Sequence, residues 1–424
     1  MMRYLLLWLT SLLLAFHSLE ARPVRPSPPT IKLEGHVGRR VRSRSRGREN
    51  VSLRDWIANT DLQWYSSIQV GTPPQTLTVM YDTGSTELVL PNKNCINCGN
   101  HRRFDPSKSQ SYSSAPAVRM VGEYCTGATT VPLSESEVVN CTVNSDTVRL
   151  GALTASDQLI VLCTQFPSVF KDLPMDGIMG LGVAPRSTED GIPTFWSWYA
   201  RGQLAEPVFS FYFVPGSVYG AELTLGGVDP SKFLGDIVYA NLNQNVSILS
   251  EAYVLDLLGL YINDRPVLTN GNYTSGVVGG QPAPFAPGLV ALDTGTAFLQ
   301  TPDQQTAEEI YRQISPYITQ IDPAGAWGAP CPILDAVATD VTFAIGGNGP
   351  PLILPRELFN LGEYPGQPGI CQAVFNNPTD PLEDPTGEGR AVWLVGSPLL
   401  KAYYTVWNGL DLRVGFAQPL PPWL

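Results

Sequence analysis

Two segments of the sequence each place an aspartate in a setting suited to acid–base chemistry. Residues 79–85 read VMYDTGS, and residues 290–296 read VALDTGT. In both, an apolar run typical of a strand ends in Asp-Thr-Gly, and a residue with a hydroxyl group follows. A single Asp-Thr-Gly is a common turn, but two copies offer two carboxylates, Asp82 and Asp293, in the same local context.

Two carboxylates can hydrolyse a peptide bond when a fold holds them a few ångströms apart. Both cannot ionise cheaply at that distance, so the pair shares one proton. The ionised member takes a proton from a water molecule, and the protonated member hydrogen-bonds the carbonyl group that the water attacks. This chemistry requires no metal ion, no cofactor, no covalent intermediate and no histidine.

Six neighbouring residues are expected to support this pair. The threonines can hydrogen-bond across to the opposite loop, the glycines allow a tight turn, and the following hydroxyl groups can donate to the carboxylates. These residues are Thr83, Gly84, Ser85, Thr294, Gly295 and Thr296.

Each motif is followed about a hundred residues later by two apolar residues and a glycine. Gly180 lies 98 residues after Asp82, and Gly396 lies 103 residues after Asp293. The same order with nearly equal spacing predicts two related lobes around an approximate two-fold axis, each offering one carboxylate. We place the boundary near Gly235, with lobes over residues 49–235 and 236–424.

The segments around both motifs have the pattern of β structure. Short apolar runs, such as 77–81, 209–213 and 392–395, are bounded by Gly, Pro, Asn and Asp. Helical patterns are rare: one starts at Thr301 and stops before Pro316, and another covers residues 193–201. The sequence therefore predicts an all-β protein of two β-barrel lobes with a few short helices.

The start of the chain, up to Arg48, differs in composition from the remainder. Residues 1–21 have the pattern of a secretory signal peptide, and residues 22–48 form an Arg- and Pro-rich propeptide with a dibasic site at Arg39–Arg40. Residues 1–48 contain ten Lys and Arg against two Asp and Glu, so residues 49–424 keep a net charge of −19. We expect a secreted zymogen whose basic leader is attracted to an acidic body. The acidic balance argues against nucleic acid or an anionic membrane as the main partner.

The separation of residues 1–48 from the remainder of the chain also excludes chemistry that depends on histidine. Two of the three histidines lie in the leader, and only His101 remains in the expected mature chain. The sequence contains neither the HExxH zinc motif nor the GxSxG nucleophile motif. His101 lies in a turn-rich stretch, where an exposed loop histidine is expected.

Seven cysteines in a secreted chain imply up to three disulfides and one free thiol. We prefer the pairs Cys95–Cys98, Cys331–Cys371 and Cys125–Cys141, which would leave Cys163 as a buried free thiol. The lone CxxC of residues 95–98 has no second pair, so a metal site is not expected. Four N-glycosylation sequons agree with secretion; they are Asn50, Asn140, Asn245 and Asn272.

Further segments resemble those of pepsin-like aspartic endopeptidases, in the secreted, fungal-type bilobal form, from about Trp64 to Ala417. The resemblance implies a bilobal pepsin-like β fold, an extended cleft and acid-favoured cleavage of proteins or peptides. It also implies inhibition by pepstatin-type compounds; with no apolar tail, we expect an extracellular monomer without a membrane anchor. The segments that carry the resemblance are 65–75, 176–182, 225–229, 403–407 and 413–417.

A hairpin called the flap covers the cleft in this family, and residues 124–127 resemble its motif. By this resemblance Tyr124 is the flap tyrosine, and Thr126 and Gly127 contact the substrate. The sequence departs from the family pattern at Val89, where a tryptophan is usual, at Ser397, where an aspartate is frequent, and at Ala297, where a serine is frequent.

Two other classes of protein share some of these features. One is a catalytically silent binding or inhibitor protein of the same fold, although such relatives commonly lose an Asp or Gly of the motif. The other is a glycoside hydrolase with two carboxylates, which leaves the repeated Asp-Thr-Gly unexplained. We therefore expect a secreted aspartic endopeptidase.

Overall fold

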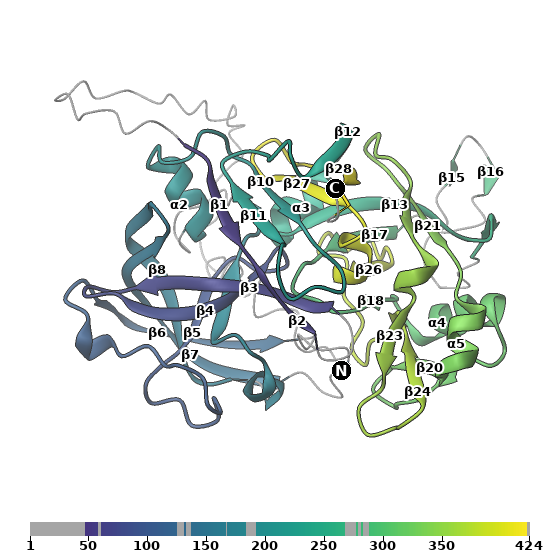
Figure 1. Cartoon of the computed structure of the whole chain (residues 1–424), viewed down its shortest axis with the longest axis horizontal. Coiled ribbons are helices and arrows are strands. Elements are labelled where there is room, and N and C mark those ends of the chain that lie inside the picture. Colours follow the sequence, from purple (N-terminus) through teal and green to yellow (C-terminus); the bar gives the residue numbers. More distant parts are fainter. Residues whose placement is uncertain are drawn as a thin grey trace, which may run out of the picture.

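The computed structural model describes residues 47–57, 61–124, 131–132, 137–166, 168–183, 192–267, 277–278, 281–282 and 288–421. Strands dominate these ranges, which confirms the predicted all-β class with a few short helices. The purple and blue strands of the first half lie on one side of the molecule in Figure 1, and the green elements of the second half lie on the other.

The first half of the chain forms an eight-stranded sheet. Its strands alternate between buried and exposed side chains where one face meets solvent, and they are buried throughout near the centre. In spatial order the strands are β2 (Arg54–Ile57), β3 (Asp61–Val70), β4 (Gln75–Asp82), β9 (Gly177–Gly180), β5 (Leu88–Pro91), β8 (Leu153–Gln165), β7 (Glu137–Leu150) and β6 (Ser113–Tyr124).

The second half forms a sheet of similar design. A two-residue strand, β14 (Arg265–Pro266), pairs with its β13. The main path runs through β22 (Leu352–Leu354), β21 (Val341–Ile345), β13 (Tyr253–Ile262), β17 (Gly288–Leu292), β26 (Val392–Val395), β18 (Leu299–Gln300) and β25 (Phe375–Asn376).

The internal repeat of the sequence is also present in the strand pairing. Along the first sheet, antiparallel and parallel pairings alternate. The β3–β4 pair is antiparallel, β4–β9 is parallel, β9–β5 is antiparallel and β5–β8 is parallel. The same alternation holds along β13, β17, β26, β18 and β25. β4 ends at the aspartate of the first motif and β17 ends just before that of the second, so the two halves present their carboxylates from equivalent strands.

A six-stranded sheet draws on both halves of the chain. Its central pair, β10 and β27, joins strands that are far apart in sequence, and its β12 crosses the predicted boundary at Gly235. The division into two lobes therefore stays a prediction, with this sheet shared between them. The strands are β1 (Glu49–Ser52), β11 (Glu222–Leu225), β10 (Phe209–Tyr212), β27 (Tyr404–Asn408), β28 (Arg413–Pro419) and β12 (Phe233–Asn241).

Aromatic side chains connect this sheet to the strands that carry the second motif. The ring of Phe209 stacks on Trp407 with centroids 6.1 Å apart. Tyr253 of β13 meets Trp407 edge-on at 4.8 Å. All three side chains are buried, so large apolar contacts hold β13 and β17 against the shared sheet.

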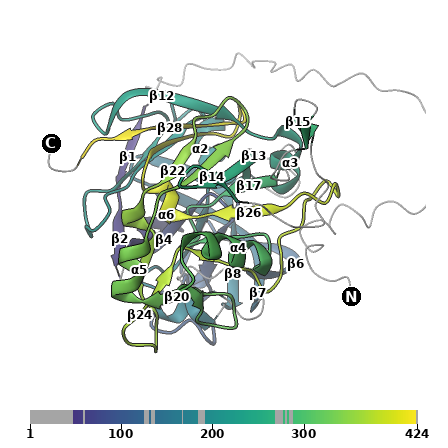
Figure 2. The same cartoon turned by 90° about the vertical axis from the view of Figure 1, so that its right-hand side faces the viewer.

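Helices and small sheets complete the described residues. α4 and α5 face the viewer in Figure 2. No helix in the described ranges is both long and apolar enough to cross a membrane. The helices are α2 (Thr194–Ala200), α3 (Gln244–Ser250), α4 (Gln304–Ile314), α5 (Cys331–Val337) and α6 (Ser397–Leu400), with 3-10 turns η1 (Pro106–Lys108), η2 (Ser168–Asp172) and η3 (Arg356–Leu358); the small sheets contain β15 (Val277–Val278), β16 (Gln281–Pro282), β19 (Thr319–Gln320), β20 (Trp327–Pro330), β24 (Ile370–Ala373) and β23 (Asn360–Glu363).

Helix α4 begins later than the sequence pattern predicted. The pattern predicted a start at Thr301, but the Asp303 carboxylate accepts the Thr306 backbone N–H and α4 starts at Gln304. The Thr301 hydroxyl instead donates to the carbonyl of Asp303 at 2.8 Å. An aspartate and a threonine both cap helices well, so the sequence alone did not select between them.

The structure corrects one of the three predicted disulfides. Cys95–Cys98 and Cys331–Cys371 are present, as predicted. Cys141 is bonded to Cys163, which lies directly opposite it in the β7–β8 ladder, so the predictions of a Cys125–Cys141 pair and a free Cys163 are wrong. Met120 is the residue of β6 opposite Cys141, because the β6–β7 register pairs Tyr124 with Glu137. Cys125 itself lies outside the described residues.

His101 is not the exposed loop residue that the sequence predicted. Its side chain is only 9% exposed. Its Nε2 lies 2.6 Å from the carbonyl oxygen of Phe170, and its Nδ1 lies 3.6 Å from a carboxylate oxygen of Asp176. The same carboxylate oxygen accepts the Arg102 backbone N–H at 2.8 Å, which turns the loop inward. The loop is thus fastened to the residue that precedes β9.

This contact predicts that His101 stabilises the protein in acid. The hydrogen bond to Asp176 is the largest cause that raises the pKa of His101 above its usual 6.5. A raised pKa adds stability that is complete below pH 6.5 and is lost as the pH rises through the folded-state value. His101→Gln is therefore expected to lower the free energy of unfolding by about 1 kcal/mol in acid and by less at alkaline pH.

Urea unfolding of both proteins at acidic and alkaline pH measures this difference. The pKa of Asp176 is lowered because hydrogen bonds from His101, Thr78 and Arg102 together outweigh the effect of burial. Its share of the stability is consequently lost only when the pH falls through that lowered value. A difference between the two proteins that grew with rising pH would contradict the assignment.

Candidate active site

The two aspartates of the repeated motif lie at equivalent places in the fold. Asp82 is the last residue of β4, and Asp293 directly follows β17. The carbonyl of Asp82 accepts the Leu181 N–H at 2.7 Å, just beyond β9. The N–H of Asp293 donates to Val395 of β26 at 2.9 Å. Each aspartate is thus fixed by the parallel strand beside it, and both side chains are buried.

Each carboxylate accepts the same two hydrogen bonds from its own loop. Asp82 accepts the Gly84 N–H at 2.8 Å and the Ser85 hydroxyl at 2.5 Å. Asp293 accepts the N–H of Gly295 at 2.7 Å and the hydroxyl of Thr296 at 2.6 Å. These donors fix both carboxylate planes, as expected from the sequence.

The two loops are joined by a reciprocal set of threonine hydrogen bonds. The N–H of Thr83 donates to the Thr294 hydroxyl oxygen at 3.1 Å, and the N–H of Thr294 donates to Thr83 in the same way at 3.0 Å. The hydroxyl of Thr83 then donates to the carbonyl of Leu292, and that of Thr294 to the carbonyl of Tyr81. Four buried bonds therefore fix the separation of the two aspartates.

The glycines of both motifs are required by close approach to the opposite carboxylate. A Cβ atom on Gly84 would lie 2.7 Å from the carboxyl carbon of Asp293. A Cβ atom on Gly295 would lie 2.5 Å from an oxygen of Asp82. Both distances are shorter than any normal contact, so only glycine lets the loops bring the two carboxylates together.

The proximity of the two acids changes how they ionise. The pKa of Asp82 is raised well above its usual value, first by burial and then by the negative charge of Asp293. The donors Ser85 and Gly84 oppose this shift without cancelling it. The arrangement favours one proton shared by two carboxylates over two ionised groups.

The later glycines of the repeat pack against the same loops. A Cβ on Gly180 would lie 2.4 Å from the backbone of Thr86, and one on Gly396 would lie 2.2 Å from the carbonyl oxygen of Thr296. The sequence showed this repeat but did not explain why a glycine is needed at positions 180 and 396. The structure supplies the reason, because each glycine lets a parallel strand pass directly beneath an aspartate loop.

Three positions that depart from the family pattern are all buried. Val89 packs in an apolar cluster with Met80 and Ile178. Ser397 donates its hydroxyl to the Thr294 carbonyl at 3.2 Å, so it supports the second loop without a charge. Ala297 is fully enclosed after the second motif.

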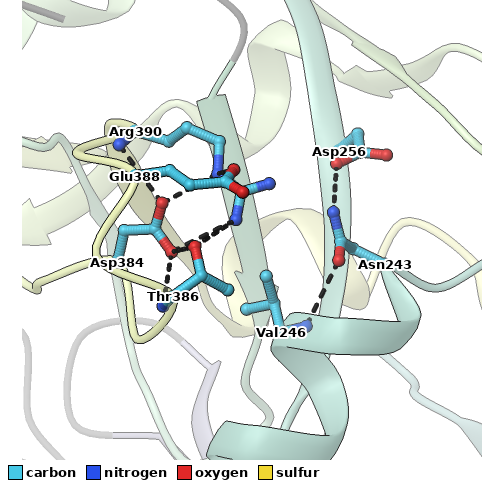
Figure 3. Close-up of polar contacts among 7 residues, drawn as sticks. All are labelled: Asn243, Val246, Asp256, Asp384, Thr386, Glu388 and Arg390. Carbon is cyan, nitrogen blue, oxygen red and sulfur yellow. Dashed lines mark hydrogen bonds and ion pairs between the residues drawn. The ribbon is translucent and has the colours of Figure 1, made fainter.

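An ion pair closes the loop that leads into β26. Arg390 donates to Asp384 through Nε at 2.8 Å and through Nη2 at 3.2 Å, as Figure 3 shows. Burial opposes ionisation of Asp384, but the hydrogen bonds from Arg390 and Thr386 outweigh it and lower its pKa to about 2. The Asn243 amide, also in Figure 3, joins Asp256 of β13 to the first turn of α3. Asp176 anchors the segment that enters β9, the strand beside Asp82. Asp384 does the same for β26, the strand beside Asp293.

Two further residues near the pair were not identified from the sequence. Gln63 donates its amide to the Gly295 carbonyl at 2.7 Å. Burial raises the pKa of Glu87, beside the first loop, to about 7, and the charge of Glu251 adds to this. Gln63 is separated from Gly295 by 232 residues, so no local pattern could reveal that contact.

The remaining predicted site residues are only partly described. Tyr124 is the last residue of β6, whereas Thr126 and Gly127 lie outside the described residues. Asn50 and Asn245 are exposed and Asn140 is half-buried. Asn272 also lies outside the described ranges. The flap and glycosylation assignments stay predictions.

Comparison with known proteins supports one family. Residues 63–419 match the family model of eukaryotic aspartyl proteases. Pepsin B of Canis lupus familiaris is 29% identical over 364 residues, which cover 84% of this chain and 81% of that protein. Cathepsin E-A of Xenopus laevis is 29% identical over 369 residues (85% and 81%), and chymosin of Callithrix jacchus is 27% identical over 392 residues (92% and 89%).

Proposed function

The chain belongs to the eukaryotic aspartyl protease family and is an aspartic-type endopeptidase, and we propose that Asp82 and Asp293 are its catalytic residues. The observation that carries this assignment is the reciprocal contact of the two loops. Each motif glycine faces the opposite carboxylate, and each motif threonine bonds to the opposite loop. Such a geometry holds two acids in one site.

The reaction follows from the shared proton. We assign the proton to Asp82, which donates a hydrogen bond to the scissile carbonyl oxygen. The ionised Asp293 removes a proton from a water molecule as the water oxygen forms a bond to the carbonyl carbon. The carbonyl oxygen takes the proton of Asp82 and a tetrahedral diol results. Asp293 then passes its proton to the amide nitrogen, the C–N bond breaks, and Asp82 regains a proton from the diol.

Cleavage of a denatured protein tests the proposed activity. The acid-treated protein is incubated with this substrate across the acidic and neutral range, with and without a pepstatin-type inhibitor. Cleavage is expected to be blocked by the inhibitor and to fall as the pH rises, because the pair of aspartates loses its shared proton. Cleavage that resists the inhibitor and increases with pH would contradict the proposal.

We further propose that the protein is secreted as a zymogen and acts as a monomer. The charge of the chain supports the zymogen: residues 1–48 carry ten basic and two acidic side chains, against a net −19 for the remainder. Gly47 and Arg48 already contact the body, through Ala205 N–H at 3.0 Å and the Val228 carbonyl at 2.5 Å. Processing at Arg39–Arg40 would leave these contacts intact.

Roles for the flap and the sequons complete this proposal. Tyr124 stands at the end of the β6–β7 ladder, where the flap motif is expected, and Thr126 and Gly127 would contact the substrate backbone. The exposed Asn50 and Asn245 are the best placed of the sequons for glycosylation. A silent binding protein is not favoured, since the aspartates and glycines of both motifs are intact.

A further inference from the structure

Gln63 makes a contact with the second aspartate loop that breaks the symmetry of the site. Its side chain is fully buried, and its Nε2 donates to the carbonyl of Gly295 at 2.7 Å. Gln63 lies on β3, in the first half of the chain, and Gly295 lies in the second half. The contact therefore crosses from one half of the repeat to the other.

The strand registers identify the counterpart of Gln63 in the second half. In the β3–β4 ladder Tyr65 pairs with Met80, so continuing the register places Gln63 beside Asp82. In the β13–β17 ladder Tyr253 pairs with Leu292, which places Ala252 beside Asp293. A methyl group cannot donate a hydrogen bond, so Ala252 cannot do for the first loop what Gln63 does for the second.

The bond to Gly295 acts on the donors that hold the carboxylate of Asp293. Gly295 donates its own N–H to Asp293, and Thr296, the next residue, donates its hydroxyl. Fixing the Gly295 carbonyl fixes the peptide group between these two residues. Burial follows the same asymmetry, because Gly295 and Thr296 are buried whereas Gly84 is exposed and Ser85 is half-buried.

We propose that Gln63 is a positioning residue that holds the second loop rigid and so makes two carboxylates with the same sequence motif inequivalent. This inference rests on the proposed function, in which Asp82 and Asp293 are the catalytic pair. The more firmly held Asp293 then serves as the ionised base, and the proton keeps a preferred place on Asp82. A pair with two equally mobile loops would exchange these roles and lose the alignment of the attacking water.

A role in packing alone does not account for a glutamine at this position. Its Oε1 atom is buried, and among the described residues it has no hydrogen-bond partner. An unpaired buried oxygen destabilises a protein, and an apolar side chain of similar size would avoid that cost. Gln63→Leu removes this oxygen but also leaves the buried Gly295 carbonyl without its donor, so the two effects offset each other. The unfolding temperature is therefore expected to stay close to that of the parent protein.

The proposal is tested by the kinetics of three variants, each expressed as the full chain and then acid-treated. Gln63→Leu removes the donor and keeps the volume. Gln63→Glu keeps a donor only while its carboxyl group is protonated. Gln69→Leu makes the matched change at an exposed position of the same strand, away from the site. For each variant kcat, KM and the unfolding temperature are measured on a peptide substrate across the acidic and neutral range.

For Gln63→Leu we expect kcat to fall about 10- to 100-fold and KM to change by less than about threefold. The acidic limb of its kcat/KM profile, which reports the first ionisation of the pair, is expected to move to higher pH, because the Gly295 and Thr296 donors loosen. Gln63→Glu should recover kcat at the acidic end and lose it as the pH rises. Gln69→Leu should match the parent enzyme.

Two outcomes would overturn the proposal. One is a Gln63→Leu enzyme with the kcat and pH profile of the parent. The other is a Gln63→Leu enzyme that loses activity in proportion to a lower unfolding temperature, with no recovery in Gln63→Glu. Both leave the assignment of Asp82 and Asp293 intact, because that assignment is tested by replacing the aspartates themselves.

Discussion

Replacing Asp82 or Asp293 by asparagine is expected to lower kcat by at least about 10³-fold, with the fold retained. Asparagine has nearly the same shape, and its Oδ1 can still accept the N–H of Gly84 or Gly295. Its Nδ2 can donate to the hydroxyl oxygen of Ser85 or Thr296, which now acts as the acceptor. The amide group of asparagine does not take up or release a proton in this reaction. The variant therefore lacks either the general base or the general acid of the pair. Cleavage of a peptide substrate by each purified variant measures the loss.

The control for this experiment is Asp236→Asn, which makes the same chemical change on an exposed residue of β12. It is expected to keep full activity. The unfolding temperatures of the three variants separate a chemical effect from a loss of structure. If either site variant retained a tenth of the parental kcat, the catalytic assignment would be wrong.

Substituting Gly295 by alanine is expected to damage both activity and stability. The new Cβ atom would lie 2.5 Å from a carboxylate oxygen of Asp82, so the loop or the carboxylate must move. Overpacking of this kind costs about 1–3 kcal/mol of unfolding free energy. A displacement of the pair should lower kcat by at least about 100-fold. Urea unfolding and peptide cleavage measure the two effects on the same preparation.

Gly366→Ala provides a control with a similar effect on stability and none on the site. Gly366 has a φ of +78° and no heavy atom within 4 Å of an added Cβ, so the substitution strains the backbone without a clash. It is expected to cost about 1 kcal/mol and to leave kcat unchanged. Equal losses of activity in the two alanine variants would mean that the effect of Gly295→Ala is not local to the carboxylates.

The central site could be predicted because its information is local and repeated. Each Asp-Thr-Gly motif contains the carboxylate, the threonine that bonds across and the glycine that permits contact. The spacing of Gly180 and Gly396 after the two motifs predicted two related lobes, each with one carboxylate. The short apolar runs bounded by Gly, Pro, Asn and Asp, with few helical patterns, then sufficed for the all-β class.

Contacts between distant segments could not be predicted in the same way. The pairing of Cys141 with Cys163 depends on the β7–β8 register, which the spacing of cysteines does not determine. The burial of His101 depends on Asp176, which lies on a distant segment of the chain. Gln63 has no motif at all, since a single glutamine in an apolar strand has many possible partners. These features follow from tertiary packing, which one sequence does not contain in readable form.

The proposed mechanism requires Asp82 and Asp293 to act as one unit around a shared proton. The most direct measurement compares kcat/KM of Asp82→Asn, Asp293→Asn and the variant that carries both substitutions. Groups that act as a unit give losses that do not multiply, so the double variant should be about as active as the less active of the two single variants. Losses that multiply in the double variant would show that the two aspartates act independently and would contradict the mechanism.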